Sequence, residues 1–424
     1  MYEEIIKRPF VRPLFLLMIG ITLYALLPYW ALAVLSAVIL LSLFPIVLLS
    51  LILPDGESSY GYRWVWGSLF SLILIAISIT ICHLSVELAN ADVGLFTYLK
   101  SAAADVQLNL VDRIGELNLA DKEKSLLATL TLGYRQALGH EAREAFSLAG
   151  VSHILAVSGF HVAVVSAIIS TLCSFMPRRG SLSLFRYSIQ IMALWIFVFI
   201  TGLAPSAVRA AVMITIYIVG RAIHRRSDGY NTLAASAFCM LVYNPAYLFD
   251  IGFQLSYMAV LSILFVMPRL QAMVDVRNPL LAIPFSWLLI SIAAQVGTAL
   301  LCFYYFGRFS MVFLFTNPPV SLISTILIPL ALLWMIYPSG WFGCGYIKIA
   351  VERLVNSLSD VVDIFARMPF ASVEFGFGLM ELLLGYAIIV LLLLYAKFHL
   401  PKLLLSALIL LLFLSLRILI SLYS

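Results

Sequence analysis

Long apolar runs without regular polar interruption dominate this chain of 424 residues. A helix needs roughly 20 apolar residues to cross a bilayer, whereas a membrane β-barrel alternates apolar and polar residues over short strands. Backbone polar groups in lipid must find partners within the chain, which leaves helices and closed barrels. The unalternated runs therefore predict an all-α, polytopic integral membrane protein.

Composition supports this fold class. Hydrophobic residues make up 63% of the chain and charged residues 11%, whereas a soluble domain carries about 25% charged residues. We expect about 10–12 membrane segments, including broken or re-entrant helices. The candidate runs are residues 14–28, 30–53, 64–87, 151–175, 185–203, 205–222, 231–244, 247–267, 280–305, 310–336, 376–396 and 401–422.

Arginines in three short loops predict which side of the membrane each segment faces. The loops contain Arg178, Arg179 and Arg186, then Arg221, Arg225 and Arg226, then Arg269 and Arg277. Because Lys and Arg collect in cytoplasmic loops, we expect the N-terminus inside and residues 88–150 outside. This topology also explains the modest net charge of +5.

The positive-inside rule fails near the C-terminal end if every run crosses, because Lys397 and Lys402 then lie outside. A re-entrant segment at 310–336 would restore the rule. Two consecutive prolines follow Asn317 in this run, and paired prolines remove two N–H donors and break a helix. An ordinary kinked span is the alternative.

Two stretches interleave charged and apolar residues and are predicted to lie along the membrane surface. Residues 92–149 indicate two amphipathic helices broken near Asn118, and residues 345–367 indicate another. The chain then has four predicted parts. They are N-terminal transmembrane helices at 1–90, extracytoplasmic or interfacial helices at 91–150, a core at 151–336, and an interfacial helix with C-terminal transmembrane helices at 337–424.

Polar groups at membrane depth are costly and usually serve a function, and the densest cluster is at 152–161. His153, Ser158, Gly159 and His161 enter one predicted span there. Ser158 and His161 should share a helix face, and Gly159 would let another backbone approach closely. Three interpretations stay open: a polar lining for a hydrophilic permeant, hydrogen bonds that hold the bundle together, or a serine–histidine nucleophile pair without an evident orienting carboxylate.

A second cluster surrounds a predicted break between two helices, marked by Gly202 and Pro205. Ser206 suits the first turn of the following helix, and Arg209 lies one turn inside it. Arg209 could bind a phosphate group with two parallel hydrogen bonds. It could equally extend its long side chain to the membrane surface.

A third cluster follows an Asn-Pro turn. Asp250, Gln254 and Tyr257 have i, i+4, i+7 spacing, which places them on one face of a predicted helix. Asp250 could cap the start of that helix, or it could pair with Arg209 across the bundle. Polar side chains of the three clusters are expected to converge on one water-filled passage.

Three motifs in this order resemble the ComEC family of competence proteins. They are HILAVSGFHV at 153–162, GLAPSAVRA at 202–210 and PAYLFDIGFQLS at 245–256. The family patterns are H-L-L-A-x-S-G-L-H-V, G-x-x-P-S-x-x-R-A and P-x-x-L-x-D-x-G-F-Q-L-S. Asn317 and Pro329 are more weakly similar to a later N-x-x-x-x-P segment. The resemblance covers about residues 121–335.

This resemblance implies a channel in the inner (plasma) membrane that passes single-stranded DNA into the cell during natural transformation. A transported polyanion needs polar walls, positive charge and stacking aromatic rings, and Arg209, His153 and His161 supply part of these. The implied partners are single-stranded DNA, the lipid bilayer, and a separate DNA receptor, nuclease and cytoplasmic motor. Assembly of several copies of this chain is a further expectation.

Two parts found in many family members are not expected in this chain. Residues 88–150 are too few for an OB-type β-barrel and indicate helices. A metallo-β-lactamase-like nuclease needs an H-x-H-x-D-H metal cluster, and no H-x-H occurs among the six histidines. No GxxxxGK[ST] phosphate-binding loop occurs either. We therefore expect no enzyme activity, no catalytic residue, no metal and no cofactor.

Two other functions remain as alternatives. A transporter for a smaller polar or anionic solute could use the same lined cavity, although such proteins normally contain inverted repeats and none is evident here. An intramembrane hydrolase would use Ser158 and His161.

Overall fold

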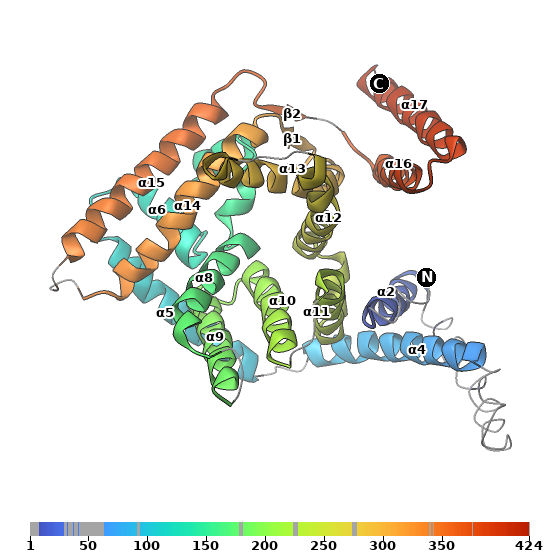
Figure 1. Ribbon diagram of the computed structural model, residues 1–424, viewed down its shortest axis with the longest axis horizontal. Helices are drawn as coiled ribbons and strands as arrows, with labels where there is room; N and C mark the ends of the chain where they lie inside the picture. The colour runs from blue at the N-terminus through green and yellow to red at the C-terminus, as the bar shows by residue number, and fades with distance from the viewer. Residues whose placement is uncertain are drawn as a thin grey trace. The chain divides into compact units, whose positions relative to one another are not determined.

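The computed structural model describes residues 8–28, 63–90, 94–177, 181–223, 228–273, 278–338, 343–374 and 376–423, together with positions 32, 37, 41 and 341. This part of the chain is nearly all helix, with one short pair of strands (Figure 1). The predicted run at 30–53 lies almost wholly outside the described residues. The chain divides into two compact units, and each is interrupted in sequence by the other.

The first unit comprises residues 1–109 and 159–257. Its helices are α2 (Val11–Leu26), α4 (Arg63–Asn90), most of α5 (Gly94–Ile114), α8 (Gly159–Leu172), η3 (Cys173–Phe175), α9 (Ser181–Ile200), α10 (Pro205–Ala222), α11 (Gly229–Tyr243), η4 (Pro245–Phe249) and the start of α12 (Ile251–Met273). Within this unit, α10 packs against α8, α9 and α11.

The second unit comprises residues 110–158 and 258–424. It contains the end of α5, the remainder of α12, and α6 (Asp121–Leu132), α7 (His140–Leu148), η2 (Ser152–Leu155), α13 (Pro279–Phe306), β1 (Arg308–Ser310), α14 (Phe313–Ile336), α15 (Cys344–Ala366), β2 (Ser372–Glu374), α16 (Leu379–Phe398) and α17 (Pro401–Tyr423). Within this unit, α14 packs against α13 and α15, and α16 packs against α17.

Seven helices of the described part are long and apolar enough to cross a membrane: α4, α9, α12, α13, α14, α16 and α17. Two shorter apolar segments, Val11–Leu26 and Gly159–Phe175, accompany them. The predicted runs at 205–222 and 231–244 correspond to α10 and α11. The chain is therefore an all-α, polytopic membrane protein, as the sequence predicts.

The predicted span at 151–175 does not form one helix. Residues Ser152–Leu155 make a 3₁₀ turn, Ala156 is extended with ψ of 150°, and α8 starts only at Gly159. The prediction that Ser158 and His161 share a helix face is therefore wrong, because Ser158 lies before the helix. The glycine and serine that follow Val157 favour a turn over a continuous helix in this segment.

The hydrophilic stretch at 92–149 contains one helix more than predicted. The break near Asn118 is confirmed, because α5 ends at Ile114 and α6 begins at Asp121. The additional helix is α7, which packs against α15. The predicted helix at 345–367 is confirmed as α15, whose apolar face is buried through Val351, Val355, Leu358 and Val362.

The run at 310–336 forms a continuous helix despite its prolines. Pro318, Pro319 and Pro329 all lie inside α14. Proline has a helical φ angle, but inside a helix it removes a hydrogen bond and its ring crowds the carbonyl of residue i−4. Packing along one face of α14, where Val320, Leu327 and other side chains are buried, outweighs that loss.

Candidate functional site

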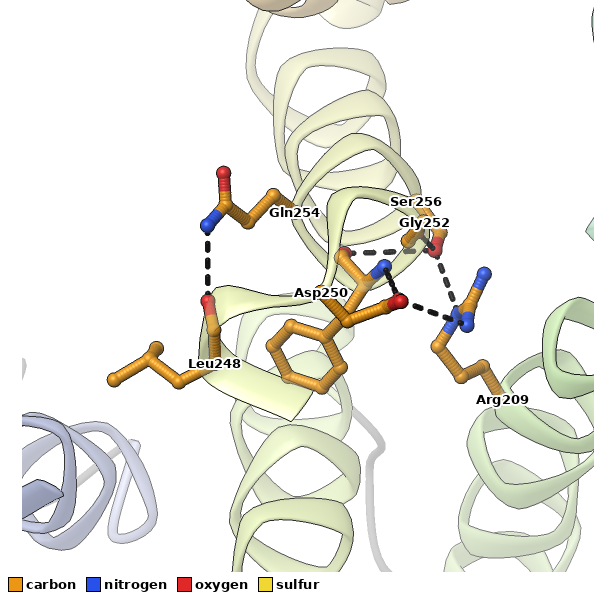
Figure 2. A network of polar contacts seen from close by, with 7 residues as sticks. Arg209, Leu248, Asp250, Gly252, Gln254 and Ser256 are labelled. Carbon is orange, nitrogen blue, oxygen red and sulfur yellow. Dashed lines mark hydrogen bonds and ion pairs between the residues drawn. The ribbon is translucent and has the colours of Figure 1, made fainter. Parts of the chain in front are cut away.

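Arg209 is the centre of a polar network between α10 and α12 in the first unit (Figure 2). Its Nε donates a hydrogen bond of 2.8 Å to Oγ of Ser256. Its Nη1 lies 3.7 Å from Oδ1 of Asp250, which is an ion pair beyond hydrogen-bonding length. The two helices are thus joined by a charge contact and a hydrogen bond.

The chain around Asp250 folds through two successive caps. Asn244 accepts a hydrogen bond of 3.0 Å from the backbone N–H of Ala246, and Pro245 opens the short helix η4. Asp250 ends η4 and accepts a hydrogen bond of 2.7 Å from the N–H of Phe253 in the first turn of α12. Short polar side chains favour such positions because they satisfy N–H groups at helix starts. Asp250 therefore caps α12 and pairs with Arg209, so both sequence interpretations are confirmed.

Gly252 lets the guanidinium approach α12. A methyl group at this position would lie 3.0 Å from Nη2 of Arg209 and 3.2 Å from Oδ1 of Asp250. Larger side chains would push the guanidinium away from its partners. The glycine of the motif thus serves the contact with Arg209.

Burial differs sharply between the two charges. The side chain of Arg209 is 7% exposed, whereas that of Asp250 is 49% exposed. A buried charge is stable only with partners, and Asp250 and Ser256 supply them. The carboxylate of Asp250 is thus half-exposed, whereas the guanidinium that it faces is enclosed.

Gln254 and Tyr257 form hydrogen bonds with groups outside the Arg209 network, although the sequence places them on the face of Asp250. Nε2 of Gln254 donates to the carbonyl of Leu248 at 3.0 Å, on the opposite side of α12 from Arg209 (Figure 2). The hydroxyl of Tyr257 lies 3.3 Å from Oγ of Ser236 in α11, and Tyr257 is buried. Gln254 thus contacts the backbone of η4, and Tyr257 contacts a side chain of α11.

The first cluster is divided by the break before α8. His161 is fully buried in the first turn of α8, and its ring centroid lies 6.0 Å from that of Phe160 in an edge-to-face arrangement. His153 lies on η2 with an exposed side chain, and Ser158 lies between the two helices. A methyl group on Gly159 would sit 3.6 Å from Cβ of Ala210, an ordinary contact. Gly159 is therefore not required for helix packing at that point.

The predicted break in the second cluster is confirmed. Gly202 has a left-handed backbone with φ of 69°, and Pro205 is the first residue of α10. Ser206 follows in the first turn, as predicted. Gly202 also contacts Gln107 of α5, because a methyl group there would lie 3.0 Å from the Gln107 amide nitrogen.

Asn317 is a buried residue of α14 in the second unit. Among the described residues, its Oδ1 and Oγ of Ser324 have no hydrogen-bond partner. Across the same residues, no three His, Cys, Asp or Glu side chains are grouped so as to hold a metal ion.

Sequence reasoning missed Ser256, Ser236 and Gln107 as contact residues. Ser256 lies inside the quoted motif, and its position one turn after Gly252 was the available signal. Gln107 and Ser236 carry no such signal, because their partners are distant in sequence.

Comparison with known proteins gives the family. A family model described as "Competence protein" matches residues 130–400, which is more than half of the chain. The chain belongs to this family of competence proteins. A relative, ComE operon protein 3 of Bacillus subtilis (strain 168), is 28% identical over 254 residues. The match covers 57% of this competence protein and 31% of that relative, so the chain spans about a third of the relative's length.

The family match confirms the resemblance drawn from the three motifs, all of which lie within residues 130–400. No solved structure matches the chain.

Proposed function

We propose that this competence protein forms a channel for one strand of DNA across the inner (plasma) membrane, and that Arg209 contacts the DNA phosphates. The observation that carries the proposal is the buried guanidinium of Arg209, held at 3.7 Å by the half-exposed carboxylate of Asp250. Family membership supports the uptake role.

Phosphate is a better ligand for Arg209 than Asp250 is in the present geometry. A guanidinium offers a planar set of donors that fits two oxygens of one phosphate. Asp250 reaches it at 3.7 Å, and its Oδ1 also accepts from Phe253. A passing phosphate therefore displaces the carboxylate without removing the cap of α12.

The polar side chains are used in contacts between helices in the present arrangement. Gln254 binds Leu248, and Tyr257 lies beside Ser236. This structure therefore corresponds to a closed channel, and DNA entry would replace the protein contacts of Arg209 by phosphate contacts. The same Arg209–Asp250 pair could instead be a structural tie between α10 and α12, and the experiment must separate the two roles.

The channel would act with other proteins. Transport of the strand needs a source of energy, which a cytoplasmic motor would supply. We also propose a separate DNA receptor, a separate nuclease and assembly of several copies of this chain. The chain itself is proposed to act as a channel and not as an enzyme.

The test measures entry of labelled linear DNA into the cytoplasm of competent cells. Deletion of the gene should abolish entry, and Arg209→Ala should lower it at least about tenfold, the equivalent of roughly 1.4 kcal/mol. Asp250→Asn should retain entry per molecule of protein in the membrane, because asparagine still caps α12 and Ser256 still holds Arg209 while the competing charge is removed. Arg8→Ala is the matched control, since it breaks the Arg8–Asp228 pair of 2.6 Å elsewhere in the same unit.

A charge exchange separates transport from structure. The double variant Arg209→Asp with Asp250→Arg retains an ion pair between the helices but moves the positive charge to α12. The proposal expects near-normal protein level in the membrane with little DNA entry. Restoration of both protein level and entry would refute a phosphate-binding role and leave only the structural tie.

A further inference from the structure

Strands β1 and β2 bring the chain just before α14 next to the chain just after α15. Strands β1 and β2 pair antiparallel, with Arg308 opposite Glu374 and Ser310 opposite Ser372. Nε of Arg308 also donates to Oε1 of Glu374 at 2.9 Å. The end of α13 and the start of α16 therefore lie on the same side of the membrane, whatever path the chain takes between them.

The N-terminal end of α14 contacts the end of residues 110–150, the hydrophilic segment that precedes α8. Oγ of Ser310 donates to the carbonyl of Leu148 at 2.8 Å. A methyl group on Gly150 would lie 2.7 Å from Cβ of Ser310 and 2.8 Å from Cβ of Phe313. This end of α14 is thus held against the last residue of α7 and the glycine that follows shortly after it.

The C-terminal end of α14 contacts the beginning of the same hydrophilic segment. The guanidinium of Arg113 donates to the carbonyl of Met335 at 2.7 Å and also to the carbonyl of Tyr337. It lies 5.7 Å from the ring centroid of the buried Trp334. A cation at the last carbonyls of a helix stabilises that end.

A crossing by α14 would force the hydrophilic segment to cross as well. At about 1.5 Å per residue, the 24 residues of α14 form a helix longer than the hydrocarbon core of about 30 Å. Arg113 and Gly150 would then lie near opposite membrane surfaces. The chain between them carries Asp121, Lys122, Glu123 and Lys124 at the start of α6, and charges of this density are costly at membrane depth.

Charged contacts also extend along α15, which lies beside α14 (Figure 1). Lys348 donates to the carbonyl of Glu116 at 2.6 Å, and Glu352 accepts from the N–H of Asn118 at 2.8 Å. Further along, Nζ of Lys122 lies 2.6 Å from Oδ2 of Asp363, with both side chains partly exposed. These contacts need a polar environment along the length of the helix pair.

The opposite face of α14 is apolar, and no described residue covers it. Phe315, Leu322, Ile326, Leu333 and Ile336 are all exposed and follow one face of the helix. The spans α13 and α16 end and begin at the strands that flank α14 and α15. Because α14 starts directly after β1 and packs against α13, the acyl chains of the leaflet around α13 are the expected occupant of this exposed stripe.

We infer that α14 and α15 lie on one side of the membrane without crossing it, with the exposed stripe of α14 resting in the lipid of that leaflet. The side is that of residues 110–150, which the basic loops predict to be outside. Residues 311–371 then contribute no crossing, and Lys402 falls inside with the other basic loops. The failure of the positive-inside rule seen in the sequence disappears. This inference does not depend on DNA transport.

Cysteine labelling tests the inference in the full-length protein. The five native cysteines are first replaced, and single cysteines are introduced as Tyr346→Cys, Phe370→Cys and Lys402→Cys. Tyr346 and Phe370 are 77% and 87% exposed, at opposite ends of α15. A membrane-impermeant maleimide is applied to intact and to permeabilised cells, with detergent-solubilised protein as the reference for full labelling.

The expected result is that Tyr346→Cys and Phe370→Cys are both labelled in intact cells, whereas Lys402→Cys needs permeabilisation. Labelling of Tyr346→Cys only from the side opposite to Phe370→Cys would overturn the inference. Gly345→Cys replaces Tyr346→Cys if that variant does not fold, because a side chain at Gly345 meets no atom within 4 Å.

Lipid contact is tested separately with a fluorophore on Leu322→Cys. Lipids brominated in their acyl chains should quench this fluorophore, and they should leave one on Tyr346→Cys nearly unchanged. Equal quenching at the two positions, or none at Leu322→Cys, would refute lipid as the occupant of the stripe.

Discussion

Gly150→Ala tests how tightly the hydrophilic segment is held against β1 and α14. Gly150 has φ of 76°, a conformation that costs a residue with a Cβ atom about 1–2 kcal/mol. The new methyl group would also lie 2.7 Å from Cβ of Ser310 and 2.8 Å from Cβ of Phe313. Neither atom is the far end of a flexible side chain, so the backbone must shift, and overpacking of this kind costs about 1–3 kcal/mol.

The two costs together predict a loss of about 2–5 kcal/mol in the stability of the second unit. The measurement is thermal unfolding of the purified protein in detergent, followed by tryptophan fluorescence. At about 2–4 °C per kcal/mol for a domain of this size, the midpoint should fall by at least about 4 °C.

Gly139→Ala is the matched control. It lies in the same hydrophilic segment, has φ of −62°, and a methyl group there would meet no atom within 4 Å. Its unfolding midpoint should stay close to that of the wild type. If Gly150→Ala and Gly139→Ala unfold at the same temperature, the close contact of Gly150 with Ser310 and Phe313 is refuted.

Two further predictions concern contacts away from the Arg209 network. Burial raises the pKa of Asp228, but the hydrogen bonds from Arg8 and the N–H of Tyr230 outweigh it and hold the pKa below the ordinary 3.8. The Arg8–Asp228 ion pair should stabilise the folded protein by about 0.2–1 kcal/mol, because both side chains are partly exposed. This stabilisation is fully present above pH 3.8 and is lost as the pH falls through the lowered pKa of Asp228. The difference in unfolding midpoint between wild type and Asp228→Asn should therefore shrink as the pH is lowered through this range. A difference that does not change with pH would contradict a stabilising ion pair. Tyr386→Phe removes a hydrogen bond of 2.7 Å to the carbonyl of Gly297 and should cost about 0.5–1.5 kcal/mol, measured by the same unfolding assay, whereas Tyr395→Phe on the same helix should cost less.

Local features of this chain could be predicted because their causes are local. Apolar run length predicts membrane helices, and Pro205 predicts the start of α10. Asp250 after an Asn-Pro turn predicts a helix cap, which the structure confirms. Each of these depends on the chemistry of a few neighbouring residues.

Local rules failed where packing or turns compete with them. The consecutive prolines at 318 and 319 predict a broken helix, yet α14 is continuous because its packing compensates for the missing hydrogen bonds. The polar cluster at 152–161 predicts one helix, yet the chain turns before Gly159. Periodicity alone placed Gln254 beside Asp250, whereas its amide turns back to Leu248.

The sequence by itself determined that this chain is a helical membrane protein of the competence type, because apolar length and ordered motifs are properties of the linear chain. Only the tertiary structure decided that Asp250 and Ser256 both hold Arg209, and that β1 returns the chain to β2 after α14 and α15. The physical reason is sequence separation. Arg209 and Ser256 are 47 residues apart and Arg308 and Glu374 are 66 apart, so only packing of distant helices brings them together.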